Sequence, residues 1–76
     1  MSKITGLTPQ EDYRLEVKFD NGSSVILSLK SRLETIRFGM LSDKELFGRA
    51  TTDGNFIRWD NKVEISVNEL FQLAQK

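Results

Sequence analysis

The sequence contains no cysteine and no histidine. Without cysteine there can be no disulfide framework, thiolate nucleophile or soft-metal site, which argues against a secreted stapled scaffold and against a zinc module. Histidine is the most frequent general base near neutral pH and the commonest metal ligand, so its absence weighs against an enzyme. We therefore expect a noncatalytic protein of a reducing cytoplasm, with no metal and no cofactor.

An excess of charge and a long apolar run are also missing. Eleven basic and eleven acidic side chains leave a net charge of zero, whereas an autonomous nucleic-acid binder usually carries a basic excess. No window approaches the roughly 20 apolar residues that span a bilayer, and the first residues lack the apolar core of a signal peptide. These observations predict a soluble cytoplasmic protein without membrane association.

The length and the scattered turn residues indicate one domain over residues 1–76. The single proline and the five glycines are not clustered into a linker, and none of the glycines belongs to a phosphate-binding loop. A domain of this size buries only about 60% of the surface that its unfolded chain exposes. We expect marginal stability.

Alternating apolar residues predict the first strands. A short edge strand precedes Pro9, and a second strand runs from Tyr13 to Phe19 with one apolar face. In the next strand, only a three-residue bulged turn places Val25 and Leu27 on the same face as the preceding apolar residues. We predict this turn, with a left-handed glycine at position 22.

A second hairpin and a third strand follow near the end of the chain. A turn at Gly54-Asn55 would place Thr52 opposite Ile57, and a turn at residues 60–62 would place Trp59 opposite Val63. We expect the tryptophan to lie in the core and its indole N–H to have a hydrogen-bond partner.

Three helical segments are predicted between and after these strands. Residues 29–36 contain good helix formers, which predict one or two helical turns with Leu29, Leu33 and Ile36 on one side. Ser42 followed by Glu45 is typical of a capping box, which predicts a helix from Asp43 to near Gly48. The predicted fold is α+β: a small antiparallel sheet of two hairpins with two or three short helices on one face, including a C-terminal helix.

The C-terminal helix has the clearest start signal. Ser66 should cap it and Glu69 should reach back to the cap, while Ile65 and Leu70 occupy the positions of a hydrophobic staple. Its predicted buried stripe consists of Val67, Leu70, Phe71, Leu73 and Ala74.

Two groups of residues are candidates for a binding surface, and no spacing brings two carboxylates together as a catalytic pair. An apolar group could contact a protein partner or a second copy, although most of its members would equally suit the core. It consists of Phe38, Met40, Leu41 and Phe47. A basic group could contact RNA or an acidic protein, although a solvated helix face balanced by Glu34, Asp43 and Glu45 is the more common explanation. It consists of Lys30, Arg32, Arg37 and Arg58.

Three segments carry a family resemblance over nearly the whole chain. They are DYRLEVKFDNGSSVILSL, the Phe-Gly-x-Leu-x-Asp-x-x-x-Phe of residues 38–47, and FIRWDNKVEISVNELF. The sequence resembles the small bacterial domains of domain-of-unknown-function family 2442, whose members commonly have proline where this chain has Asp60. The resemblance implies an α+β domain and brings no established activity or site.

Some members of that family are similar to this domain followed by a helix-turn-helix module, and their genes often neighbour another short one. The resemblance therefore implies a partner protein or a toxin–antitoxin-like pair. The sequence given ends at Lys76 without the DNA-binding module, so we do not expect a transcription factor. Our first hypothesis is a noncatalytic interaction module with a protein partner or a homo-oligomer. A nucleic-acid-associated or antitoxin-like protein is the alternative.

Overall fold

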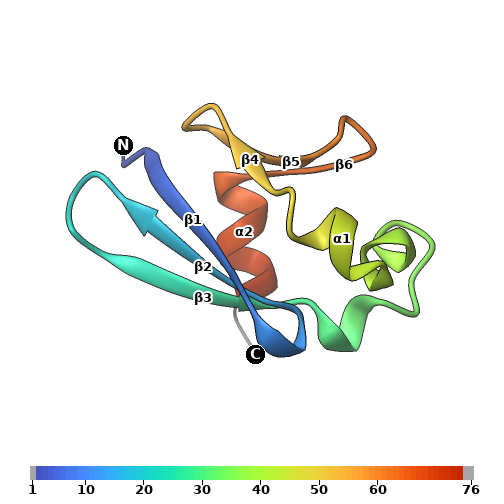
Figure 1. Ribbon diagram of the computed structural model, residues 1–76. Coiled ribbons are helices and arrows are strands. Elements are labelled where there is room, and N and C mark those ends of the chain that lie inside the picture. Colours follow the sequence, from blue (N-terminus) through green and yellow to red (C-terminus); the bar gives the residue numbers. More distant parts are fainter. Residues whose placement is uncertain (1, 75–76) are drawn as a thin grey trace.

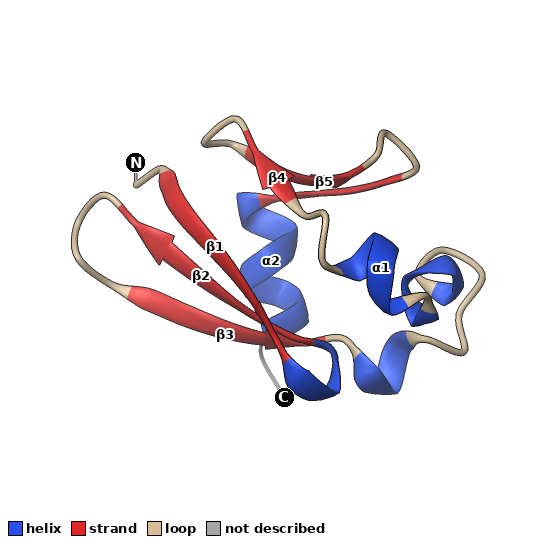
Figure 2. Cartoon of the chain, in the orientation of Figure 1, coloured by secondary structure: helices blue, strands red, loops and turns tan. Residues whose placement is uncertain are grey.

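The computed structural model describes residues 2–74 as an α+β fold (Figures 1 and 2), which confirms the predicted class. The strands form two antiparallel sheets, in the orders β1-β2-β3 and β4-β5-β6, where the sequence predicted one sheet of two hairpins. The strands are β1 (Ile4–Gln10), β2 (Arg14–Phe19), β3 (Ser24–Ser28), β4 (Thr51–Thr52), β5 (Phe56–Trp59) and β6 (Val63–Ser66). The helices are α1 (Lys44–Phe47) and α2 (Val67–Ala74), and 3-10 turns lie at Glu11–Tyr13, Lys30–Arg32 and Gly39–Ser42.

Strands β2 and β3 form the predicted hairpin. Val17 lies opposite Val25 and Leu15 lies opposite Leu27, which confirms the register of the three-residue turn. Gly22 has a φ of 87°, in the left-handed region where a side chain would be strained. The alternation of apolar and polar residues therefore set the register, because a slip of one residue would turn the apolar side chains to water.

Strand β1 is the predicted edge strand, although it continues one residue beyond Pro9 to Gln10. Pro9 lies opposite Leu15 and is tolerated because one side of an edge strand needs no ladder donor. At the other end of β1, the backbone N–H of Ile4 donates to the carbonyl oxygen of Gly54 at 2.9 Å. This bond ties the first sheet to the turn between β4 and β5.

The second sheet also has the predicted register. Thr52 lies opposite Ile57 and Trp59 lies opposite Val63. The turn between β5 and β6 places Asp60 in the left-handed region with a φ of 51°, a conformation that aspartate tolerates better than most residues.

Helix α2 follows β6 directly and packs against β3 and β6. The Ser66 hydroxyl accepts a hydrogen bond from the N–H of Glu69 at 3.1 Å, so the predicted cap is confirmed. The carboxylate of Glu69 does not reach back to that cap and accepts hydrogen bonds from Arg37 instead. Phe71 is also not in the buried stripe: it is 43% exposed, and its ring stacks on Phe19 with 5.5 Å between centroids.

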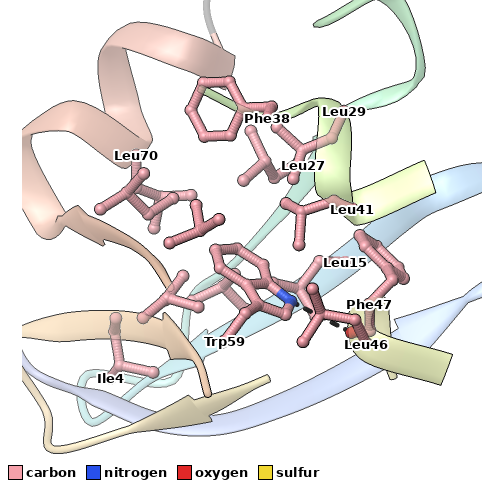
Figure 3. Close-up of a cluster of buried hydrophobic side chains, with 14 of the residues drawn as sticks. Ile4, Leu15, Leu27, Leu29, Phe38, Leu41, Leu46, Phe47, Trp59 and Leu70 are labelled. Carbon is pink, nitrogen blue, oxygen red and sulfur yellow. Dashed lines mark hydrogen bonds between the residues drawn. The ribbon is translucent and has the colours of Figure 1, made fainter. Parts of the chain in front are cut away.

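Trp59 lies in the middle of the core, as expected (Figure 3). Its indole N–H donates to the carbonyl oxygen of Phe47 at 3.1 Å, across 12 positions of the sequence. The buried apolar side chains around it come from both sheets, both helices and the turns between them: Ile4, Leu15, Val17, Phe19, Leu27, Leu29, Phe38, Leu41, Leu46, Phe47, Ile57, Val63, Ile65 and Leu70.

The segment from Leu29 to Ile36 contains one helical turn, within the one or two that were predicted, but its apolar residues do not share one side. Only residues Lys30–Arg32 form a 3-10 turn, so the helical spacing that would place three apolar side chains on one side does not continue. Leu29 is buried and Leu33 is half-buried, whereas Ile36 is fully exposed, at 101%. Ile36 therefore does not share one side with Leu29 and Leu33, as had been predicted.

Helix α1 begins one residue later than predicted and ends before Gly48, as expected. Its cap is Asp43, whose carboxylate accepts a hydrogen bond from the N–H of Glu45 at 3.0 Å, and not Ser42. Asp43 and not Ser42 caps the helix because Ser42 belongs to the preceding 3-10 turn. Neither helix within residues 2–74 is long and apolar enough to cross a membrane.

Candidate functional site

The connection between the turn Lys30–Arg32 and α1 displays an apolar side chain on an anchored backbone. We call residues 34–40 the displayed loop. Ile36 at its centre is fully exposed, and Met40 is 45% exposed. Burying an isoleucine or a methionine side chain contributes about 1.5–3 kcal/mol. Fully exposed, Ile36 gains none of this stabilisation within the chain.

Hydrogen bonds hold the displayed loop on both sides of Ile36. The Thr35 hydroxyl donates to the carbonyl oxygen of Arg32 at 2.6 Å and accepts from the N–H of Phe38 at 3.3 Å. The side chain of Phe38 is itself buried in the core. The outward direction of Ile36 is therefore fixed by its neighbours.

Arg37 provides the strongest anchor of the displayed loop. Its guanidinium forms a bidentate ion pair with the carboxylate of Glu69, in which one N–H···O distance is 2.7 Å, and donates to the backbone carbonyl of Glu64 at 2.7 Å. The same guanidinium lies over the ring of Phe38, 4.9 Å from its centroid. The hydrogen bond between Arg37 and Glu69 raises the pKa of Arg37 and lowers the pKa of Glu69. Arg37 thus joins the loop to β6 and to the first turn of α2.

A second feature is a concavity of about 680 Å³ between the β1–β2 connection and α1. Its lining is mixed and consists of Pro9, Gln10, Glu11, Asp12, Tyr13, Lys44, Phe47 and Gly48. Asp12 pairs with Lys30 at 2.9 Å, and this hydrogen bond is the largest cause that lowers the pKa of the Asp12 carboxyl. A carboxylate held in its charged form by a lysine is a poor general base, because its affinity for a proton is reduced.

Tyr13 borders this concavity in a strained conformation. Its φ of 60° follows a φ of 64° at Asp12, and a bulky residue in the left-handed region costs about 1–3 kcal/mol. Two contacts hold it there: its hydroxyl donates to the carbonyl oxygen of Ser42 at 2.6 Å, and its ring meets the ring of Phe47 edge-on at 5.6 Å. No sequence signal predicts this conformation at a tyrosine, although the aspartate before it is a residue that often adopts it.

The structure separates the predicted apolar group. Phe38, Leu41 and Phe47 are buried, and only Met40 is exposed. These four residues therefore do not form one exposed apolar surface, because the core takes three of them. Ile36, which was predicted to lie on the same side as Leu29 and Leu33, is the most exposed apolar side chain of this region. Its β-branched neighbour Thr35 was a weak signal that the helix would stop.

The structure also divides the predicted basic group. Arg37 and Arg58 both contact Glu64, since Arg58 donates to its carboxylate at 3.1 Å. Lys30 lies elsewhere, paired with Asp12 at the β1–β2 connection. Arg32 forms no ion pair with any residue in the range 2–74. The four residues do not form one unpaired basic patch.

Arg58 belongs to a small charged network on the second sheet. Besides Glu64, it binds the carboxylate of Asp53 at 2.8 Å. Asp53 also accepts hydrogen bonds from the backbone N–H groups of Asn55 and Phe56. The N–H of Asn55, the Arg58 guanidinium and the N–H of Phe56 lower the pKa of Asp53 to about 2. This arrangement closes the β4–β5 turn and leaves the carboxylate no free role in acid–base chemistry.

Within residues 2–74, no three acidic side chains gather into a group that could hold a metal ion, and no polar or charged side chain is buried. Perturbed carboxylates lie in turns or ion pairs, where their hydrogen bonds serve the fold.

A model of the family described as protein of unknown function (DUF2442) matches residues 4–76, nearly the whole chain, so the resemblance seen in the sequence is confirmed. No curated protein and no solved structure was found to match the chain.

Proposed function

We propose that this chain, which belongs to the DUF2442 family, is a noncatalytic protein-interaction domain that presents Ile36 and Met40 to a protein partner. The observation that carries the proposal is the full exposure of Ile36 on the displayed loop, between residues that are tied down by hydrogen bonds. An apolar side chain that is held outward can be buried by a partner without a large ordering cost.

The anchoring of the loop is what separates this case from an ordinary exposed apolar residue. Single exposed apolar side chains are common on protein surfaces and carry no function by themselves. Here Arg37 connects the loop to Glu69 of α2 and to the backbone of Glu64 in β6. Two elements, α2 and β6, thus hold the loop that carries Ile36, and a partner would meet a preformed surface.

The test is a comparison of loop variants in affinity purification from the source cells. The wild-type chain should enrich at least one protein that Ile36→Ser no longer retains, because the apolar anchor is lost. Glu34→Ser is the matched control, since Glu34 is an exposed, polar neighbour in the same loop. Equal recovery of the same proteins by Ile36→Ser and Glu34→Ser would refute the role of the displayed loop.

A nucleic-acid-associated or antitoxin-like role has less support. Lys30, Arg37 and Arg58 are engaged with carboxylates, which neutralises much of the charge that phosphates would require. Arg32 alone does not make a basic surface. Binding of a nucleic acid that weakens steeply with salt, and that is lost when Arg32 and Arg37 are reversed to glutamate, would support this role instead.

A further inference from the structure

The outer edge of β3 carries backbone groups without a partner. Backbone hydrogen bonds of Leu29 to Tyr13 and of Phe19 to Ser23, each 2.9 Å long, set the phase of the β2–β3 ladder. In an antiparallel ladder, the N–H and C=O of one residue point to the same side of the strand, and those of the next residue point to the opposite side. Those of Val25 and Leu27 therefore point to β2. The groups that point outward belong to Ser24, Ile26 and Ser28, and none of them is hydrogen-bonded to any residue described by the structure.

This edge lacks the protection seen at the other long edges. Natural edge strands are usually blunted by charges, proline, bulges or covering segments. Strand β1 contains Pro9 and is tied to Gly54, and the outer carbonyl of Glu64 in β6 accepts a hydrogen bond from Arg37. Strand β3 reads Ser-Val-Ile-Leu-Ser, with no charge, no proline and a regular register. Figures 1 and 2 show it at one edge of its sheet, with β1 at the other.

The sequence of β3 has the same pattern of residue types in both directions: serine, aliphatic, isoleucine, aliphatic, serine. If a second β3 approached antiparallel with Ile26 at the centre, serine would lie opposite serine and Val25 opposite Leu27. Ile26, which is 48% exposed, would lie opposite Ile26 of the second copy. The outward backbone groups would also be in register, because Ile26 would exchange both hydrogen bonds with its counterpart. This self-complementarity is what a twofold interface requires.

Charges beyond the ends of β3 agree with the same register. Asp20 lies in the turn at one end of the strand, and Arg32 lies in the turn at the other, where Lys30 is already paired with Asp12. In an antiparallel pair of copies, each turn with Asp20 therefore meets the turn with Arg32 of the other copy. Asp20 is exposed and accepts one hydrogen bond, from the backbone N–H of Lys3 at 3.2 Å, and Arg32 has no ion-pair partner among residues 2–74. The opposite charges favour a second copy of this chain over an unrelated strand.

We propose that two copies of this chain form a twofold-symmetric dimer by antiparallel pairing of their β3 strands, centred on Ile26. The interface is one short strand and two turns, which places it among small, transient interfaces, with a dissociation constant of about 10 µM to 1 mM. The displayed loop is a different surface, so this proposal does not rest on the proposed function. Refutation of the dimer would not affect the proposed partner contact of the displayed loop, and refutation of that contact would not affect the dimer.

Single-cysteine variants test the register directly, because the chain has no cysteine of its own. Directly opposite residues that exchange both hydrogen bonds have Cα atoms about 5.5 Å apart, which lies within disulfide range. Ile26→Cys should therefore form a disulfide-linked dimer under mild oxidation. Ser24→Cys is the matched control on the same edge: its counterpart lies about 13 Å further along the strand, so it should not crosslink to itself. An equimolar mixture of Ser24→Cys and Ser28→Cys should crosslink.

Sedimentation across a dilution series tests whether the dimer exists without a crosslink. As the concentration of the wild-type chain is raised to about 1 mM, it should shift from monomer to dimer. Ile26→Pro removes the outward N–H and no bond of the β2–β3 ladder, so it should dimerise at least tenfold more weakly than Ile26→Ala, which keeps that N–H. A wild-type chain that stays monomeric, equal dimerisation of the two variants, or equal crosslinking of Ile26→Cys and Ser24→Cys would overturn the proposal. If Ile26→Pro does not fold, the crosslinking comparison decides.

Discussion

Replacement of Trp59 by phenylalanine should lower the free energy of unfolding by about 2–4 kcal/mol. The indole is fully buried and donates to the carbonyl oxygen of Phe47, the last residue of α1, at 3.1 Å. A carbonyl at a helix C-terminus has no partner within the helix, so its loss of the indole donor costs about 1–3 kcal/mol. The smaller ring also leaves a cavity, which adds about 1 kcal/mol. A domain of this length is expected to have only about 4–11 kcal/mol of stability in total.

Urea unfolding followed by far-ultraviolet circular dichroism measures this loss, since the fluorescence probe disappears with the only tryptophan. Amide hydrogen exchange should show faster opening of α1 in Trp59→Phe, because its C-terminal carbonyl is no longer tied to β5. Phe71→Leu is the control, because it removes a ring from a side chain that is 43% exposed. It should lower the free energy of unfolding by less than about 1 kcal/mol. A loss below about 0.5 kcal/mol in Trp59→Phe would refute the reasoning that the indole hydrogen bond holds α1 to the second sheet.

Three other substitutions test local features of the fold. Gly22→Ala should destabilise the chain by about 1–2 kcal/mol in urea unfolding, from backbone strain alone, because no other atom lies within 4 Å of the added carbon; an unchanged midpoint would contradict this. Tyr13→Phe removes the hydroxyl that donates to Ser42 and should cost about 0.5–1.5 kcal/mol, whereas a neutral result would mean that the aromatic contact alone holds the strained turn. The lowered pKa of Glu69 stabilises the fold above the ordinary glutamate pKa of 4.5, and this stabilisation is lost as the pH falls through the folded value. Thermal unfolding between about pH 6 and 3 should therefore show a weaker acid dependence in Arg37→Met than in the wild type; parallel curves would exclude the ion pair as the cause.

Features that depend on neighbouring residues were predictable from the sequence. The register of β2 and β3 follows from the alternation around Val17 and from a glycine at position 22, and both are local. The register of β5 and β6 followed in the same way from the turn after Trp59. The cap at Ser66 was also predictable, because its partner N–H is only three residues away.

Features that depend on distant partners were not predictable. Glu69 had a local role as the second half of a capping box, and an arginine 32 residues away takes its carboxylate instead. A bidentate ion pair with Arg37 replaces a single hydrogen bond to a backbone N–H, and it is the stronger interaction. Ile36 was placed by a predicted helical spacing, but the helical turn in the structure ends at Arg32, and the side chain of Ile36 is exposed.

The candidate site shows the same limit. The apolar run was rightly suspected of containing both core and exposed residues, but hydrophobicity does not tell which is which. Phe38, Leu41 and Phe47 belong to the buried cluster that contains Trp59, and Met40 does not. The exposed partner of Met40 in the displayed loop is Ile36, and it was found only once the backbone between Leu33 and Phe38 was placed.

The most direct test of the proposed function is the affinity of the purified chain for the protein that it recovers from its source cells, measured by isothermal titration calorimetry. If Ile36 is buried by the partner, Ile36→Ser should raise the dissociation constant by about 10- to 100-fold, the equivalent of about 1.5–3 kcal/mol of apolar burial. Glu34→Ser should leave it unchanged. An Ile36→Ser chain that is folded and binds as tightly as the wild type would contradict the account.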